Sequence, residues 1–172
     1  MHERVQWWQQ DMPPTILSQG RYEAFISALD DPDEDHSPGR SGCAWIIKRC
    51  GGDGQIVHSD AKVSPSSESD EQRGFVAATL GVVASFAGRC SVLIHTNNEH
   101  VVNALNGGAL KWRKKGWRNS QKQPIKSAEL WALILELQKQ RNTIASGEKE
   151  TRPNVLEIEQ AHQMAVKALK GS

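Results

Sequence analysis

Residues 111–131 read KWRKKGWRNSQKQPIKSAELW, and this stretch concentrates the positive charge of the chain. It holds seven Lys and Arg residues, and no Asp or Glu occurs between Glu99 and Glu129. The 172-residue chain has a formal net charge of +1, so the remainder carries 14 Lys and Arg against 20 Asp and Glu, a net charge of −6. A basic segment on an otherwise acidic chain predicts a local docking site for a polyanion.

Upstream of this segment, three short apolar stretches are separated by turn-forming residues. Tyr22–Leu29, Gly42–Arg49 and Gln55–Val63 are typical of strands and predict an antiparallel meander. The stretch DDPDEDHSPGR at 30–40 is rich in acids, proline and glycine and predicts a loop.

The rest of the chain alternates between helical and strand patterns. A short, almost fully apolar strand that follows a helix is typical of buried parallel pairing. We expect helices over Glu71–Phe86, Glu99–Leu105, Ser127–Arg141 (capped by Ser127) and Val155–Lys170, a strand over Ser91–His95, and a weak strand within 143–154. This order predicts an α/β fold whose mixed sheet has five strands, or four if the weak strand does not form.

Residues 1–20 contain Trp7-Trp8 and Pro13-Pro14 and form a separate N-terminal extension in our interpretation, ahead of a domain over 21–172. The extension either docks by its tryptophans or remains a tail. Three cysteines are too few for a disulfide framework or a zinc site. No apolar run approaches the roughly 18–20 residues of a membrane span, and no signal peptide is visible, so we expect no membrane partner and an intracellular protein of cytoplasm or nucleus.

The basic stretch resembles a motif of the type 1 ribonuclease H family, W-[KR]-x-x-G-W-[KR], followed by P-[VI]-K-[NS] and L-W. The matching residues are Trp112, Gly116, Trp117, Pro124, Lys126, Leu130 and Trp131. Residues 42–47 (GCAWII), 75–80 (FVAATL), 95–105 (HTNNEHVVNAL) and 161–165 (AHQMA) also resemble segments of that family, so the resemblance covers roughly residues 22–170.

This resemblance implies the ribonuclease H-like fold, with helices flanking the mixed sheet. It also identifies the basic stretch as the family's handle, or basic protrusion, which grips a nucleic-acid backbone. The residues expected to bind RNA–DNA hybrid or double-stranded nucleic acid are Lys111, Trp112, Arg113, Lys114, Lys115, Trp117, Arg118, Lys122 and Lys126.

The family cuts the RNA strand of a hybrid with two Mg²⁺ ions held by Asp, Glu, Asp and a last Asp. At the third position this chain has Asn97, whose amide offers one neutral oxygen. The second position falls on Gly74, which has no side chain, although Glu71 lies one turn earlier and is a possible substitute. The fourth position falls on His162. No confident metal ligand is therefore expected.

Two alignments of the first position stay open. Aligning Phe25-Ile26 with the first strand of the family puts Ser27 at the Asp position, whereas a slide of three or four residues puts Asp30 or Asp31 there. The loop spacing to Gly42 favours the slide.

Three hypotheses follow from these residues. The first is a catalytically inactive domain that binds nucleic acid through the handle, or serves as a scaffold in a nucleic-acid complex. The second is a ribonuclease H with an altered site, which alone would need Mg²⁺ or Mn²⁺. The third is a protein-interaction module that binds a protein partner or forms a homodimer through the N-terminal extension.

Overall fold

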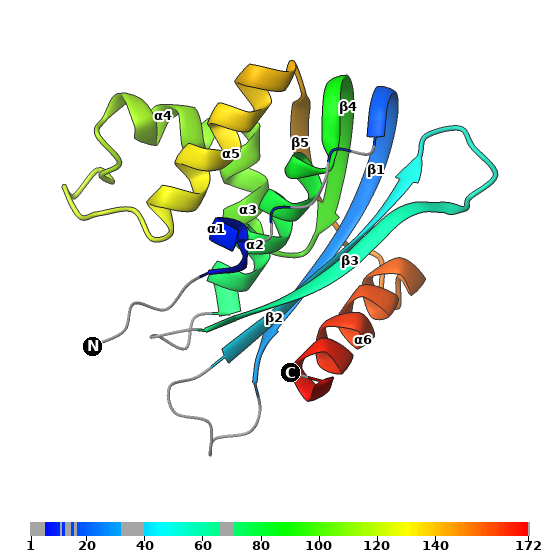
Figure 1. Ribbon diagram of the computed structural model, residues 1–172. Coiled ribbons are helices and arrows are strands. Elements are labelled where there is room, and N and C mark those ends of the chain that lie inside the picture. Colours follow the sequence, from blue (N-terminus) through cyan, green and yellow to red (C-terminus); the bar gives the residue numbers. More distant parts are fainter. Residues whose placement is uncertain are drawn as a thin grey trace.

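A twisted five-stranded sheet crosses the centre of the molecule (Figure 1). The computed structural model describes residues 6–10, 12, 15, 17–31, 40–65 and 71–171. The strands lie in the order β3-β2-β1-β4-β5. Their bounds are β1 Leu17–Asp30, β2 Arg40–Arg49, β3 Ile56–Pro65, β4 Phe86–Thr96 and β5 Ile144–Lys149.

The first three strands form an antiparallel meander, and β4 and β5 add to it in parallel. Alternation along β1 sends Tyr22, Ala24, Ile26 and Ala28 into the larger core. The other face of the sheet packs a smaller apolar cluster, centred on Ile46 of β2.

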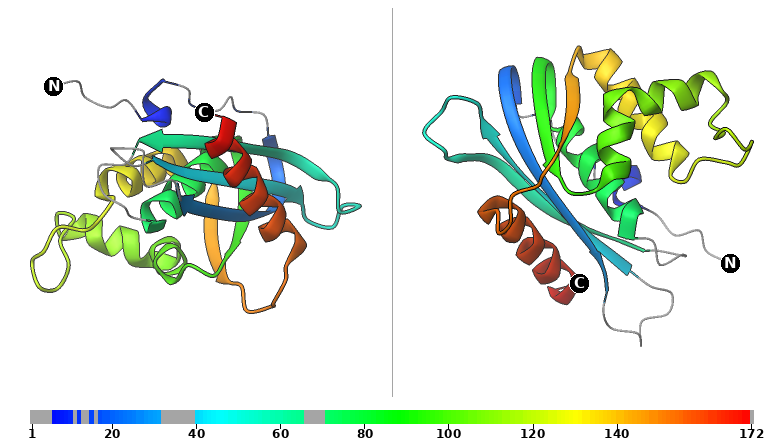
Figure 2. Two further views of the ribbon diagram at one scale, coloured as in Figure 1. Left: turned by 90° about the horizontal axis from the view of Figure 1, so that it is seen from below. Right: turned by 180° about the vertical axis from the view of Figure 1, so that it is seen from behind.

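Helices cover both faces of the sheet. The larger core lies under α2, α3, α4 and α5, while α6 is the one described helix that crosses the opposite face (Figures 1 and 2). The helices are α1 Trp7–Gln10, α2 Glu71–Ala84, α3 Glu99–Asn103, α4 Ala109–Lys114, α5 Ala128–Arg141 and α6 Leu156–Gly171, and the kinked segment η1 over Ala104–Gly108 joins α3 to α4. Within the described part of the chain, no helix has the length and apolar character needed to cross a membrane.

The predicted mixed sheet is confirmed, and it has five strands because the weak pattern in 143–154 forms β5. The predicted helix over Glu71–Phe86 ends two residues early, and β4 is twice as long as the strand expected from Ser91 to His95. Phe86 belongs to β4, where it pairs with Leu17 of β1, and its fully buried ring packs against that of Tyr22 with centroids 5.0 Å apart.

The predicted helix over Glu99–Leu105 ends at a kink, where Asn106 and Gly107 have non-helical backbone angles, and α4 follows as a second helix. Gly107 has a φ of 120°, which lets the chain kink between the two helices. Beside it, the side-chain amide of Asn106 makes two hydrogen bonds to the backbone of Gly147 in the edge strand β5, at 2.8 and 2.9 Å. The kink is therefore fastened to the sheet.

The prediction that Ser127 caps α5 was wrong. Ser127 has a left-handed backbone, with φ of 60°, and its side chain makes no capping hydrogen bond. Its hydroxyl oxygen instead accepts a hydrogen bond from Arg73 of α2 at 3.2 Å. A side chain committed to a neighbouring helix is not free to cap its own.

Part of the N-terminal stretch lies against the sheet layer. Trp7 is 7% exposed, and its ring lies 5.8 Å from that of Trp45 in β2. Strand β1 already begins at Leu17.

Candidate functional site

A cavity of about 920 Å³ lies between α6 and the sheet. Most of its wall is apolar, and the polar groups come from β1, from the segment after β4, and from α6. The lining residues are Ile26, Ser27, Ala28, Ile46, Ile56, Phe75, Asn97, Leu156, Ile158, Glu159, Gln160, His162, Gln163 and Met164.

Three of the sequence-predicted site residues meet in this cavity. Ser27 Oγ of β1 and His162 Nδ1 of α6 lie 3.5 Å apart. The parallel register pairs Phe25 with His95, so Ser27 is level with Asn97, which follows the end of β4. Three separate elements thus bring a hydroxyl, an amide and an imidazole to one wall.

Gly74 of α2 is buried beside the same site, against Ala28 of β1. A Cβ built on Gly74 would lie 2.7 Å from the Cβ of Ala28, which is closer than real Cβ atoms approach. The backbone there leaves no room for a side chain unless the strand or the helix shifts. Glu71 begins α2, but its side chain lies outside the described residues.

Asp30 is the last residue of β1 and Asp31 follows it, and neither is among the residues that line the cavity. The carboxylate of Asp31 is 7% exposed and pairs with the guanidinium of Arg40 at 2.7 Å. Arg40 also donates a hydrogen bond to the carbonyl of Leu169 near the end of α6. Asp31 therefore helps to join β1, β2 and α6.

The cavity wall does not fit a pair of hard dications. Mg²⁺ prefers several carboxylate oxygens, whereas Ser27, Asn97 and His162 offer uncharged donors when the imidazole is neutral, and Gly74 offers none. Glu159 supplies the single carboxylate among the lining residues. In the part of the chain that the structure describes, no group of three His, Cys, Asp or Glu side chains is placed to hold a metal ion.

A second polar group surrounds His95, and its carboxylates, Glu23 and Glu150, were missed from the sequence. His95 stacks on Phe25 with ring centroids 4.8 Å apart, and its two nitrogens lie 3.1 Å from Glu23 and 3.9 Å from Glu150. Arg152 donates hydrogen bonds to Glu150 and holds the pKa of that carboxyl at about 2, against the opposing effect of burial. Residues two apart in a strand lie on the same face of the sheet, so Glu23 and Phe25 share the face of Ser27. This spacing is the sequence signal that could have revealed the group.

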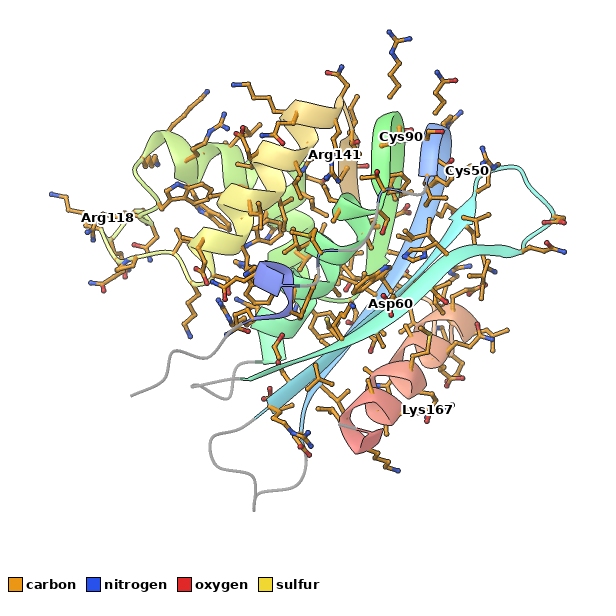
Figure 3. The ribbon with its side chains drawn as sticks, viewed as in Figure 1. Cys50, Asp60, Cys90, Arg118, Arg141 and Lys167 are labelled. Atoms are coloured by element: carbon orange, nitrogen blue, oxygen red, sulfur yellow. The ribbon has the colours of Figure 1, made fainter. Side chains whose placement is uncertain are left out.

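The seven basic residues of the handle are all exposed. They lie on α4 and on the loop that leads to α5, which projects away from the sheet; Arg118 extends from this loop in Figure 3. Among the residues that the structure describes, no carboxylate forms an ion pair with any of the seven. Their charge is therefore available to an external anion.

The handle loop has internal order. The side chain of Asn119 accepts hydrogen bonds from the backbone of Gln121 and Gln123, both at 2.9 Å. The guanidinium of Arg118 donates to the carbonyl of Lys122 at 3.0 Å, and an isolated bridge pairs Arg118 with Pro124. These contacts present the cations from a defined loop conformation.

The two tryptophans of the handle pack against the body of the protein. Trp112 and Trp117 are partly buried against the larger core. The ring of Trp112 stacks on that of His100, with centroids 5.4 Å apart, and the indole N–H of the buried Trp131 donates to His100 Nε2 at 3.0 Å. His100 thus joins α4 to α5, a role that its position in the sequence did not reveal.

Comparisons with known proteins support the fold described above. The RNase H family model matches residues 35–169. Ribonuclease H of Pseudoalteromonas atlantica is 39% identical over 59 residues, which are 34% of this chain and only 39% of that protein. Ribonuclease H of Brucella ovis is 25% identical over 114 residues, or 66% of this chain and 70% of that protein.

Solved structures share the fold at low sequence identity. LC9-RNase H1, described as a type 1 RNase H with the type 2 active-site motif, has a TM-score of 0.68 at 16% identity, covering 89% of this chain and 74% of its own. A foamy viral protease-reverse transcriptase in complex with dsDNA has a TM-score of 0.67 at 19% identity, covering 94% of this chain and 100% of its own. The same viral protein in complex with RNA/DNA hybrid has a TM-score of 0.62 at 22% identity, covering 100% of this chain and 23% of its own.

Proposed function

The chain belongs to the RNase H family, and from this premise we propose that it binds RNA–DNA hybrid or double-stranded nucleic acid through its handle without cutting it by the two-metal reaction. One contrast carries the proposal. Seven exposed cations on the handle form no ion pair with a described carboxylate. At the family's metal-ligand positions the resemblance assigns Asn97, His162 and Gly74, and at the first position the cavity is lined by Ser27 and by neither Asp30 nor Asp31.

The handle supports binding for an electrostatic reason. Lys and Arg side chains that neutralise phosphates release condensed counterions, which favours association and makes it dependent on salt. The cations of the handle need not break an internal ion pair to do so, because no described carboxylate holds them. Two of the fold neighbours are described with bound dsDNA and RNA/DNA hybrid, which supports a duplex ligand.

The cavity supports the loss of cutting. Two adjacent dications need several negative charges to hold them. A carboxylate side chain at residue 74 is also opposed by packing, because its Cβ would lie 2.7 Å from the Cβ of Ala28. A domain that keeps the grip and lacks the metal ligands is suited to a scaffold role in a nucleic-acid complex.

Binding is tested with a 20-base-pair RNA–DNA hybrid over a series of salt concentrations. We expect log Kd to depend steeply on log salt, and the Lys114→Ala/Lys115→Ala variant to reduce the slope by about 1 to 2. The matched control is Lys167→Ala/Lys170→Ala, because these two exposed lysines lie on α6 across the sheet; Lys167 is labelled in Figure 3. Absent binding, or binding that salt does not change, contradicts the proposal.

Cutting is tested on the same hybrid with Mg²⁺ and separately with Mn²⁺. We expect no cleavage with either ion. Cleavage that is lost in Asp31→Asn or Glu71→Gln would instead establish a nuclease with an altered site.

A further inference from the structure

The basic handle joins the body of the protein at two points, which we call its roots. The second root is held by contacts that involve the N-terminal segment. The first root is α4, which stacks on His100 and follows the kink fastened by Asn106. The second root is Ser127, where the loop turns into α5 with a left-handed backbone. The backbone oxygen of Ser127 accepts the first hydrogen bonds of α5, so its position sets where the loop ends.

Arg73 of α2 grips this second root with two contacts. Its guanidinium donates to Ser127 Oγ at 3.2 Å and forms an ion pair with Glu129 Oε1 at 2.5 Å. The planar fork of an arginine makes such a two-partner contact more rigid than a lysine ammonium would. A third contact comes from Trp8, whose ring centroid lies 5.5 Å from the guanidinium carbon of Arg73.

Trp8 is itself held in place by its neighbour. Trp7 is 7% exposed, lies 5.8 Å from Trp45 of β2, and meets Trp8 edge-to-face at 5.5 Å. A continuous chain of contacts thus runs from the sheet through Trp7, Trp8 and Arg73 to Ser127. A tryptophan face is the best aromatic partner for a guanidinium, and the contact restricts the rotamers of Arg73.

We infer that Trp8 and Arg73 are positioning residues, which hold the second root of the handle in the conformation that binds nucleic acid. The pair Trp7–Trp8 then links the sheet to the handle, and we call this link the strap. This inference rests on the proposed function. A handle that is ordered before binding loses less conformational entropy when it meets the duplex, which strengthens association without adding a contact.

The test measures hybrid affinity, its salt slope, and amide hydrogen exchange at residues 115–127 in the free protein. We expect Arg73→Gln to weaken affinity about fivefold and Trp8→Ala about two- to threefold, both with faster exchange in the loop and an unchanged salt slope. The Trp8→Ala/Arg73→Gln variant should be no weaker than Arg73→Gln alone, because Trp8 acts through Arg73. Arg73→Lys should fall between wild type and Arg73→Gln, and Arg21→Gln is the control for loss of an exposed arginine.

Three outcomes would overturn the strap. A salt slope reduced by about 1 in Arg73→Gln would show that Arg73 binds a phosphate itself. Additive effects in the double variant would show that Trp8 does not act through Arg73. Unchanged exchange at 115–127 would show that the root is not held by these residues. The proposed function has its own test, because it fails if Lys114→Ala/Lys115→Ala leaves binding unchanged. In that case the exchange measurement on the free protein still shows whether Trp8 and Arg73 hold the second root.

Discussion

Gly74 of α2 and Ala28 of β1 touch so closely that a Cβ on residue 74 would lie 2.7 Å from the Cβ of Ala28. Helical Gly→Ala replacement ordinarily stabilises a protein by about 1 kcal/mol, whereas overpacking a core costs about 1–3 kcal/mol. We therefore expect Gly74→Ala to lower the free energy of unfolding, measured by urea denaturation.

The partner variant tests the cause. Ala28→Gly/Gly74→Ala removes the methyl group that Gly74→Ala meets and should recover part of the loss. Gly171→Ala, where nothing lies within 4 Å of an added Cβ, should leave stability nearly unchanged. A Gly74→Ala protein as stable as the wild type would disprove the steric argument.

A second prediction concerns the return of metal binding. The variant Ser27→Asp/Ala28→Gly/Gly74→Glu/Asn97→Asp supplies three carboxylates and the space for one of them. We expect it to bind Mn²⁺ in a calorimetric titration, where the wild type binds none, because clustered carboxylates are the ligands of hard dications. The control Ser27→Asn/Ala28→Gly/Gly74→Gln, which leaves Asn97 in place, has similar shape without charge and should not bind. Equal titration curves for the carboxylate variant and this control would refute the prediction.

The sequence was sufficient for the family resemblance and the mixed five-stranded sheet because both depend on local patterns. The motif from Trp112 to Trp131 lies on one continuous segment, and Asn97 and His162 lie within segments that match the family. The structure brings Asn97 and His162 to one cavity, and their roles there stay a prediction.

What the sequence left open depends on contacts between distant segments. The register of β1 against β4, which brings Ser27 level with Asn97, is set by strand pairing that a lone sequence does not show. The interaction of Arg73 with Ser127 spans 54 positions, and it overrode the local signal for a helix cap. A long-range side-chain contact of this kind has no local signature.

A third prediction concerns the contact that joins α4 to α5. His100→Phe keeps a ring to stack on Trp112 but removes the acceptor of the Trp131 indole N–H. Because Trp131 is fully buried, its unpaired N–H should cost about 1–3 kcal/mol of unfolding free energy. Adding Trp131→Phe to His100→Phe should cost less than Trp131→Phe costs in the wild type, and additive losses would contradict the hydrogen bond.

Thiol reactivity provides a fourth prediction. Burial raises the pKa of the Cys43 thiol to about 12, so almost no thiolate is present at pH 8. Cys50 lies half-buried in the turn after β2. We expect a maleimide to label Cys50 in the native protein and Cys43 only after unfolding, as read by peptide mass spectrometry. Labelling of Cys43 at the rate of Cys50 would be incompatible with its burial.

The last prediction concerns the pH dependence of the polar group around His95 and Glu150. The hydrogen bonds from Arg152 hold the pKa of Glu150 at about 2 in the folded protein, below its ordinary value near 4.5. A carboxyl with a lowered pKa stabilises the fold above its unfolded pKa, and this stabilisation is lost as the pH falls through the folded pKa. Glu150→Gln should therefore lower the free energy of unfolding by about 1 kcal/mol at pH 7, and the difference should shrink between pH 4.5 and pH 2. The measurement is urea denaturation across this range, with Glu148→Gln at an exposed position of β5 as the control. A deficit that stays constant down to pH 2 would show that Glu150 acts through packing and not through its charge.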